Sequence, residues 1–278
     1  MPKIKVNGVE LNYQEYGKGK EVFVRAQSSA FSSNQDRLLS RFPPDYHFYM
    51  LDLSRRYDSD PGDRLFNIWA QDVYQFSREL GLGKFIYWGA SHGGGIGFHL
   101  ALAHPEVLKG FVSEVGVPHD RSRPLPEMSN LRRKQREAGN NTEKARIVVR
   151  AVLETMFNPT TEKRRLEIRE RFLNEAVEKY VNRSPGDLSI TVGTPLPDCK
   201  TNEELGRRLG QIKVPTLLIV GGQDPQVSTE VSIIALKAIP GAKAVFFQDE
   251  GHFISMESPE KLVPEIVTFV NKINKTLQ

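Results

Sequence analysis

The segment FIYWGASHGGGIGFHLALAHPE, residues 85–106, places an apolar run before a cluster of glycines and an alanine-rich stretch after it. The apolar run predicts a buried strand, and the stretch after the glycines predicts a helix. Gly89 and Gly93 lie two residues before and two residues after Ser91. This G-x-S-x-G pattern is typical of a sharp strand-to-helix turn that exposes a serine, because only small residues fit beside the turn. We therefore interpret Ser91 as a candidate nucleophile.

Glycines at the start of a helix can instead surround a phosphate group. A P-loop requires Gly-Lys-Ser/Thr, whereas no lysine follows the glycines of residues 93–97. A dinucleotide fingerprint requires G-x-G-x-x-G, and these glycines do not have that register. The sequence therefore favours the nucleophile turn over a phosphate site.

A serine nucleophile needs a general base and an acidic residue that orients the base. Asp224 follows the apolar run TLLIVGG, and His252 follows VFFQDEG, so each lies just beyond a late strand. The chain order Ser91, Asp224, His252 is one of the orders in which such triads occur. Glu114, at the end of another predicted strand, is an alternative position for the acid, which we rank below Asp224.

The chain resembles the α/β-hydrolase superfamily with a helical cap in four segments: VNGVELNYQEYGKG, WGASHGGG, LLIVGGQDPQV and EGHFISMESPEKL. The resemblance covers nearly the whole chain. It implies that Ser91 is the nucleophile, that His252 is the base and that Asp224 orients the base. No cofactor and no metal are implied, because a covalent serine mechanism requires neither.

The order of predicted elements indicates the same fold class. Near-continuous apolar runs, which are typical of strands buried on both faces, alternate with segments of helical periodicity. The sequence therefore predicts an α/β fold with a doubly wound, mostly parallel sheet. Residues 1–116 and 213–278 are expected to form the core, with a helical cap at 117–212 inserted after the sixth strand.

Apolar residues recur at helical spacing within residues 141–158 and 160–183, and Thr201 with Glu204 forms a capping-box pattern. We expect these helices to form a lid across the edge of the sheet where ligands bind.

The oxyanion hole is expected to consist of backbone amides, one of them from His92 directly after the nucleophile. Many family members supply the second amide from a His-Gly loop after the third strand. Here the segment RAQSS follows EVFV, so Arg25 stands in place of the His and Ala26 in place of the Gly. The amide of Gln27 or of Ala26 is the expected second donor.

Four residues are candidates for contact with substrate. Arg25, Arg55 and Arg56 could recognise an acidic group, and His119, at the start of the insertion, could contact a ligand. The alternative, which we favour for the arginines, is pairing at the surface with nearby acids: Asp52, Asp58 and Asp60.

The net charge of +4 is unevenly distributed. Residues 121–171 contain 14 Lys or Arg and 7 Asp or Glu, so this segment carries +7 and the remainder carries −3. Such a segment can attract polyanions, but no aromatic residues interleave its LRRKQR cluster as a single-strand nucleic-acid surface favours. We therefore expect solvated basic helix faces and no nucleic-acid partner.

No apolar run is long enough for a membrane span, and the first residues do not resemble a signal peptide. We expect a cytoplasmic protein with no membrane partner. The single cysteine, Cys199, excludes an intrachain disulfide framework and a multi-cysteine metal site.

Together these features predict a hydrolase of a small carboxylic ester or lactone that acts through an acyl-enzyme. Two alternatives remain open: a C–C bond hydrolase of the meta-cleavage-product type, and a ligand sensor that keeps the fold with slow or no turnover. Dehalogenases and epoxide hydrolases of this superfamily use Asp as nucleophile, so Ser91 argues against them.

Overall fold

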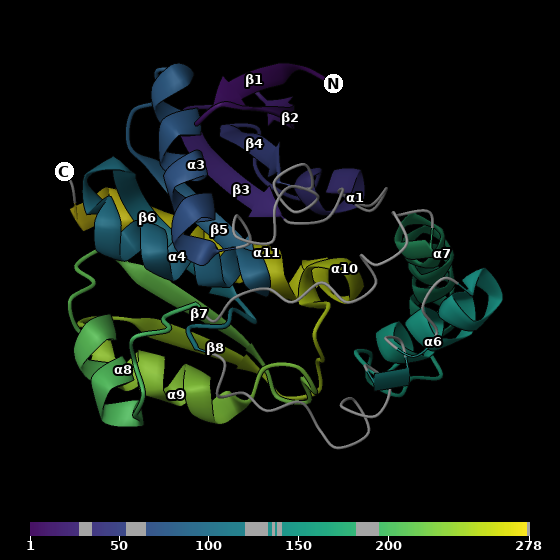
Figure 1. Cartoon of the computed structure of the whole chain (residues 1–278). Coiled ribbons are helices and arrows are strands. Elements are labelled where there is room, and N and C mark those ends of the chain that lie inside the picture. Colours follow the sequence, from purple (N-terminus) through teal and green to yellow (C-terminus); the bar gives the residue numbers. More distant parts are fainter. Residues whose placement is uncertain are drawn as a thin grey trace.

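An eight-stranded sheet forms the centre of the computed structural model, which describes residues 1–27, 35–53, 65–119, 133–134, 137, 141–181 and 195–276 (Figure 1). The strand order is β1-β2-β4-β3-β5-β6-β7-β8. β2 pairs antiparallel with β1 and β4, and all other neighbours are parallel, which confirms the predicted sheet. The strands are β1 (Lys3–Val6), β2 (Val9–Gly17), β3 (Glu21–Gln27), β4 (Tyr46–Asp52), β5 (Phe85–Ala90), β6 (Leu108–Glu114), β7 (Thr216–Gly221) and β8 (Lys243–Phe247).

Helices cover both faces of the sheet (Figure 1). One apolar cluster joins the sheet to α3 (Phe66–Glu79), α4 (His92–Ala103), α8 (Asn202–Leu209) and α9 (Thr229–Ala238). The cluster on the other face involves α1 (Gln35–Leu39), α10 (Ile254–Glu257) and α11 (Pro259–Thr276). A short 3₁₀ turn, η2 (Pro105–Val107), connects α4 to β6. This two-sided covering explains why the central strands are apolar along their whole length.

The strand β5 illustrates how the sequence determines this core. Phe85 and Tyr87 pack into one cluster, whereas Ile86 and Trp88 pack into the other, and all four side chains are fully buried. Successive side chains of a strand point to opposite faces, so a strand between two helical layers must be apolar at every position.

The insertion between β6 and β7 contributes α6 (Thr142–Glu154) and α7 (Lys163–Val181), which lie beside the core (Figure 1). These two helices share a small apolar cluster of their own, made of Val149, Leu153, Leu173 and Val177. None of the helices in the described part of the chain is both long and apolar enough to cross a membrane.

The helix α8 lies within the range 117–212 that the sequence analysis assigns to the cap. The capping box of Thr201 and Glu204 is present at the start of α8, as the sequence predicts. However, Leu205 and Leu209 of this helix are buried in the same cluster as the sheet, α3 and α4. α8 therefore packs as part of the core, and α6 with α7 forms the described helical part of the insertion.

Candidate active site

The three predicted triad residues lie beyond the carboxyl ends of parallel strands: Ser91 after β5, Asp224 after β7 and His252 after β8. Since the strands are parallel, these ends meet at one edge of the sheet, where open α/β sheets bind their ligands.

Ser91 occupies a strained turn between β5 and α4. Its backbone angles are φ 52° and ψ −115°, a conformation that residues other than glycine rarely adopt. A Cβ atom on Gly89 would overlap the carbonyl group of Gly93, and one on Gly93 would lie 2.7 Å from the carbonyl oxygen of Ala26. The turn therefore requires the two glycines that the sequence pattern singled out.

His252 and Asp224 are in direct contact. His252 Nδ1 lies 2.8 Å from Asp224 Oδ2, and both side chains are buried. The other carboxylate oxygen, Oδ1, accepts hydrogen bonds from the amides of Gln226 and Val227 at 2.7 and 3.1 Å. An ionised carboxylate can only accept, so Nδ1 donates and Nε2 is left to receive a proton.

Glu114, the alternative acid, is engaged elsewhere. Its carboxylate accepts hydrogen bonds from Trp88 Nε1 at 3.0 Å and from the amide of Ser255 at 2.8 Å. Its backbone carbonyl accepts the amide of Ser91 at 2.9 Å. Glu114 therefore joins the serine turn to the segment that follows His252, while Asp224 contacts the His252 ring.

Among the described residues, no hydrogen bond joins Ser91 to the His252 ring. Such bonds are often long until substrate is bound, so this geometry is compatible with a base that takes the serine proton.

The end of β3 bears on the choice between the two expected oxyanion donors, Gln27 and Ala26. β3 continues through Gln27, whose carbonyl accepts the amide of Leu53 at 2.8 Å on the β4 side. The N–H and C=O groups of one strand residue point to the same side, so the Gln27 amide faces β4 and not the serine turn. The carbonyl of Ala26 instead lies against Gly93. Of the two expected donors, this orientation favours Ala26.

His92 is the first residue of α4, so its amide projects from the amino terminus of that helix. Its ring lies edge-on to Phe66 of α3, with ring centroids 5.9 Å apart. The role of this amide as an oxyanion donor stays a prediction.

Arg25 is buried, so its position matches neither the candidate contact with an acidic substrate group nor the favoured pairing with an aspartate at the surface. Its side chain is 1% exposed, and its guanidinium group stacks over Trp88 at 3.8 Å. Its acidic neighbour is Glu114, at 3.5 Å, and not a surface aspartate. Burial lowers the pKa of Arg25, and the Glu114 carboxylate opposes that shift. The sequence could not reveal this position, because arginine is rarely buried in a central strand.

The remaining substrate-contact candidates stay predictions. His119 is buried shortly after β6. Arg55 and Arg56, with the possible partners Asp58 and Asp60, lie outside the described residues.

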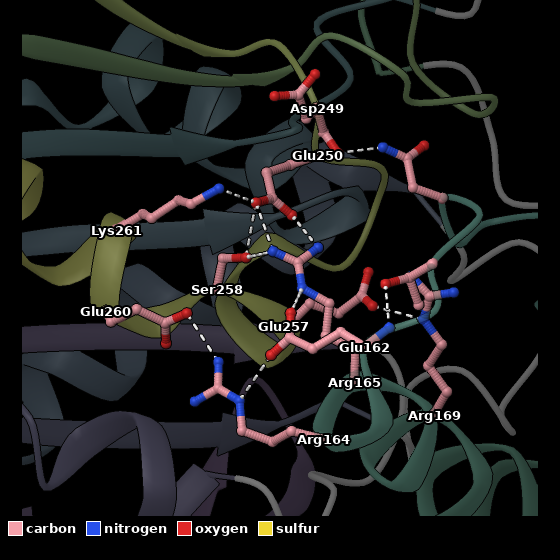
Figure 2. A network of polar contacts seen from close by, with 12 residues as sticks. Glu162, Arg164, Arg165, Arg169, Asp249, Glu250, Glu257, Ser258, Glu260 and Lys261 are labelled. Atoms are coloured by element: carbon pink, nitrogen blue, oxygen red, sulfur yellow. Dashed lines mark hydrogen bonds and ion pairs between the residues drawn. The ribbon is translucent and has the colours of Figure 1, made fainter.

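A group of residues that the sequence analysis missed surrounds the loop of His252. Arg165 and Arg169 of α7 form ion pairs with Glu250 and Glu257, two acids that flank His252 in the chain (Figure 2). The signal was present as acidic residues in DEGHFISMESPE and basic residues in KRRLEIRER, but spacing alone does not pair segments some 85 residues apart.

A cavity lies away from this group of charged residues. A cavity of about 360 Å³ is lined by the amino ends of β6, β7 and β8 and by α11, at the opposite edge of the sheet from Ser91. Within the part of the chain that the structure describes, no three His, Cys, Asp or Glu side chains gather in a way that could hold a metal ion.

Solved structures with the same fold include esterases and a lactonase. An esterase from Thermogutta terrifontis shares 20% identity, with 98% of this chain and 99% of that chain covered, at a TM-score of 0.73. The esterase RhEst1 from Rhodococcus sp. ECU1013 shares 18% identity over 98% of both chains, at a TM-score of 0.76. The enol-lactonase from Burkholderia xenovorans LB400 shares 20% identity, with coverages of 97% and 100%, at a TM-score of 0.72.

No curated protein sequence matches this chain significantly. The family model described as alpha/beta hydrolase fold matches residues 25–259, a range that contains the serine turn, Asp224 and His252. The chain therefore belongs to the α/β hydrolase fold family.

Proposed function

We propose that this protein is a serine hydrolase that cleaves a small carboxylic ester or lactone through an acyl-enzyme on Ser91. The observation that carries the proposal is the contact of His252 Nδ1 with Asp224 Oδ2, at the sheet edge where a strained turn presents Ser91. The esterase and lactonase activities of proteins with the same fold are consistent with this chemistry.

In the first step, Ser91 Oγ attacks the carbonyl carbon of the ester while His252 Nε2 takes the hydroxyl proton. Asp224, as a buried acceptor at Nδ1, stabilises the imidazolium that forms. The amides of His92 and Ala26 would donate to the oxyanion of the tetrahedral intermediate. The intermediate collapses when the C–O bond to the alcohol breaks, and the alcohol leaves with the proton from His252.

In the second step, water attacks the acyl-enzyme. His252 takes a proton from this water and returns it to Ser91 Oγ as the carboxylic acid is released. For a lactone, the alcohol and the acid are parts of one molecule, so ring opening in the first step leaves the alcohol tethered.

The test is hydrolysis of short p-nitrophenyl esters by the wild-type protein and by Ser91→Ala. We expect the substitution to lower kcat/KM by about 10⁴-fold or more, as for triad serines in general. Ser228→Ala is a matched control, because Ser228 directly precedes α9 and its side chain makes no capping hydrogen bond to that helix. A fluorophosphonate should label Ser91 and no other residue.

Ester turnover that survives Ser91→Ala, or labelling at another residue, would contradict the proposal. A panel of esters, lactones and diketones separates the remaining candidates. Preferred cleavage of a diketone would indicate a C–C bond hydrolase, whereas tight binding without turnover would indicate a sensor.

A further inference from the structure

The loop that carries His252 is held by a cluster of charged side chains from two parts of the chain (Figure 2). Glu250, two residues before His252, is 1% exposed at its side chain. Arg165 of α7 donates two hydrogen bonds to it, from Nη1 to Oε2 at 3.0 Å and from Nη2 to Oε1 at 2.9 Å. Ser258 Oγ and Lys261 Nζ each lie 2.7 Å from Oε1. Glu250 therefore connects α7 to the start of the loop that carries His252.

These hydrogen bonds keep Glu250 ionised. Burial by itself raises the pKa of this carboxyl, but the bonds from Arg165, Lys261 and Ser258 outweigh burial and hold the pKa below its usual value. A bidentate arginine–carboxylate pair fixes orientation as well as distance.

A second ion pair holds the other end of the same loop. Arg169 Nε donates to Glu257 Oε1 at 2.5 Å, and both side chains are buried. The guanidinium group of Arg169 also stacks over Phe157, at 4.9 Å. Arg165 and Arg169 are four residues apart on α7, so they project from one face of the helix. Together the two arginines bind Glu250 and Glu257, and His252 lies between these two acids in the chain.

The connection between α6 and α7 adds direct contacts to this loop. The amide of His252 donates to the carbonyl of Met156 at 3.2 Å, and the side-chain amide of Asn158 donates to the carbonyl of Asp249. The ring of Phe253 lies 4.7 Å from Phe157 and 4.8 Å from Phe172, measured between centroids. The insertion therefore contacts the backbone and the next side chain of the candidate base.

We infer that Arg165 and Arg169 are positioning residues for His252, so that the seating of α6 and α7 on the core sets the orientation of the catalytic base. This inference rests on the proposed function of His252. Asp224, which follows β7, contacts the imidazole ring of His252. The insertion contacts the backbone of His252 through the carbonyl of Met156. Through these contacts, the insertion influences the reactivity of the triad.

The physical basis is the geometry of arginine. Lysine keeps the positive charge but cannot form the planar two-pronged pair, so Arg165→Lys loosens the loop without leaving Glu250 as an uncompensated charge. A displacement of about 1 Å in a catalytic group can cost about 100-fold in rate.

The experiment compares Arg165→Lys and Arg169→Lys with Arg164→Lys. Arg164 is a matched control, because it lies on the same helix and pairs at 2.9 Å with Glu260, an acid of α11 outside the His252 loop. The measurements are kcat and KM for a p-nitrophenyl ester, the acidic limb of the pH–rate profile, and amide hydrogen exchange across residues 249–257.

We expect Arg165→Lys and Arg169→Lys to lower kcat about tenfold or more, with KM changed less than twofold. The acidic limb should shift, and exchange across residues 249–257 should be faster than in the wild-type protein. Arg164→Lys should match the wild-type protein in every measurement.

Faster exchange with unchanged kcat and an unchanged pH profile would overturn the positioning role and leave the proposed function intact. Equal effects of all three substitutions would also overturn it, because they would indicate general destabilisation of α7. A wild-type protein that neither hydrolyses esters nor reacts with a fluorophosphonate would instead overturn the proposed function itself, whatever the exchange data show.

Discussion

Glu114 connects three parts of the candidate site through one side chain and one carbonyl group. Its carboxylate binds Trp88 and the amide of Ser255, its carbonyl binds the amide of Ser91, and Arg25 lies 3.5 Å from it. The side chains of Arg25 and Glu114 are each only 1% exposed. A buried ion pair of this kind contributes little net stability, but removal of one partner leaves an uncompensated charge.

We predict that Arg25→Met destabilises the protein by about 3 kcal/mol, because it leaves the Glu114 carboxylate buried without a cation. The double variant Arg25→Met with Glu114→Gln should be more stable than Arg25→Met alone, since glutamine removes the charge and keeps an acceptor for the amide of Ser255. The recovery should be partial, because the glutamine NH2 group cannot accept the hydrogen bond of Trp88 Nε1. Urea unfolding of the wild-type protein and the variants measures both effects. Wild-type stability in Arg25→Met would contradict the assigned ion pair.

At the residue scale, the sequence predicts those site residues that local sequence features identify. Asp224 and His252 are recognisable because each follows an apolar strand and precedes a turn, and the structure places them in contact. Arg25 is misassigned from the sequence, because its burial depends on Trp88 and Glu114, which are distant in the chain. No local pattern encodes such a neighbourhood.

At the scale of elements, the turn from β5 to α4 is the feature with the least steric freedom. A Cβ atom on Gly89 would overlap backbone atoms of Gly93 and Gly94, which cannot move without breaking the turn. Ser91 is already strained at φ 52°, so the turn has no alternative geometry available at low cost.

We predict that Gly89→Ala destabilises the protein by about 3 kcal/mol and abolishes fluorophosphonate labelling of Ser91. The control is Gly83→Ala, in the loop before β5, where a Cβ atom meets no heavy atom within 4 Å. It should change the free energy of unfolding by less than about 1 kcal/mol. Similar losses of stability in the two variants, measured by thermal unfolding, would argue against the steric explanation.

The helix α8 shows why a secondary-structure element is easier to predict from the sequence than the residues it packs against. The capping box of α8 is a local signal, carried by Thr201 and Glu204, and the structure contains it. The layer in which α8 packs depends on Leu205 and Leu209 meeting apolar side chains of the core, which is long-range information. For this reason the sequence predicts the helix itself but not the layer in which it packs.

At the scale of the whole molecule, the basic insertion meets acidic residues of the core. The excess of positive charge in residues 121–171 suggests solvated helix faces when the sequence is considered alone. In the structure, Arg164 pairs with Glu260 at the surface, whereas Arg165 and Arg169 pair with the buried carboxylates of Glu250 and Glu257. Part of the charge asymmetry therefore lies in the contact between the insertion and the core.

The protonation of His99 depends on how tightly the side chains around α4 pack. Its ring stacks on Phe66 of α3, with centroids 6.4 Å apart, and its Nε2 has no hydrogen-bond partner among the described residues. Burial lowers the pKa of His99 to about 4; Arg208 of α8 adds to the shift and Asp198 opposes it. Three helices thus converge on a histidine that is held neutral in the folded protein.

This pKa predicts how acid destabilises the whole molecule. The unfolded chain binds a proton at His99 near its ordinary pKa of 6.5, whereas the folded protein binds it only near pH 4. The folded state therefore loses stability as the pH falls from 6.5 to 4, and His99 contributes on the order of 3 kcal/mol to this loss. Urea unfolding of the wild-type protein and His99→Gln, between pH 7.5 and pH 4, measures the contribution.

The substitution also changes packing, but that effect is the same at every pH, so the free energies of unfolding of the two proteins should converge or cross as the pH falls. Two parallel curves across this range would show that His99 is accessible to water and protons in the folded protein, and that α3, α4 and α8 do not enclose it.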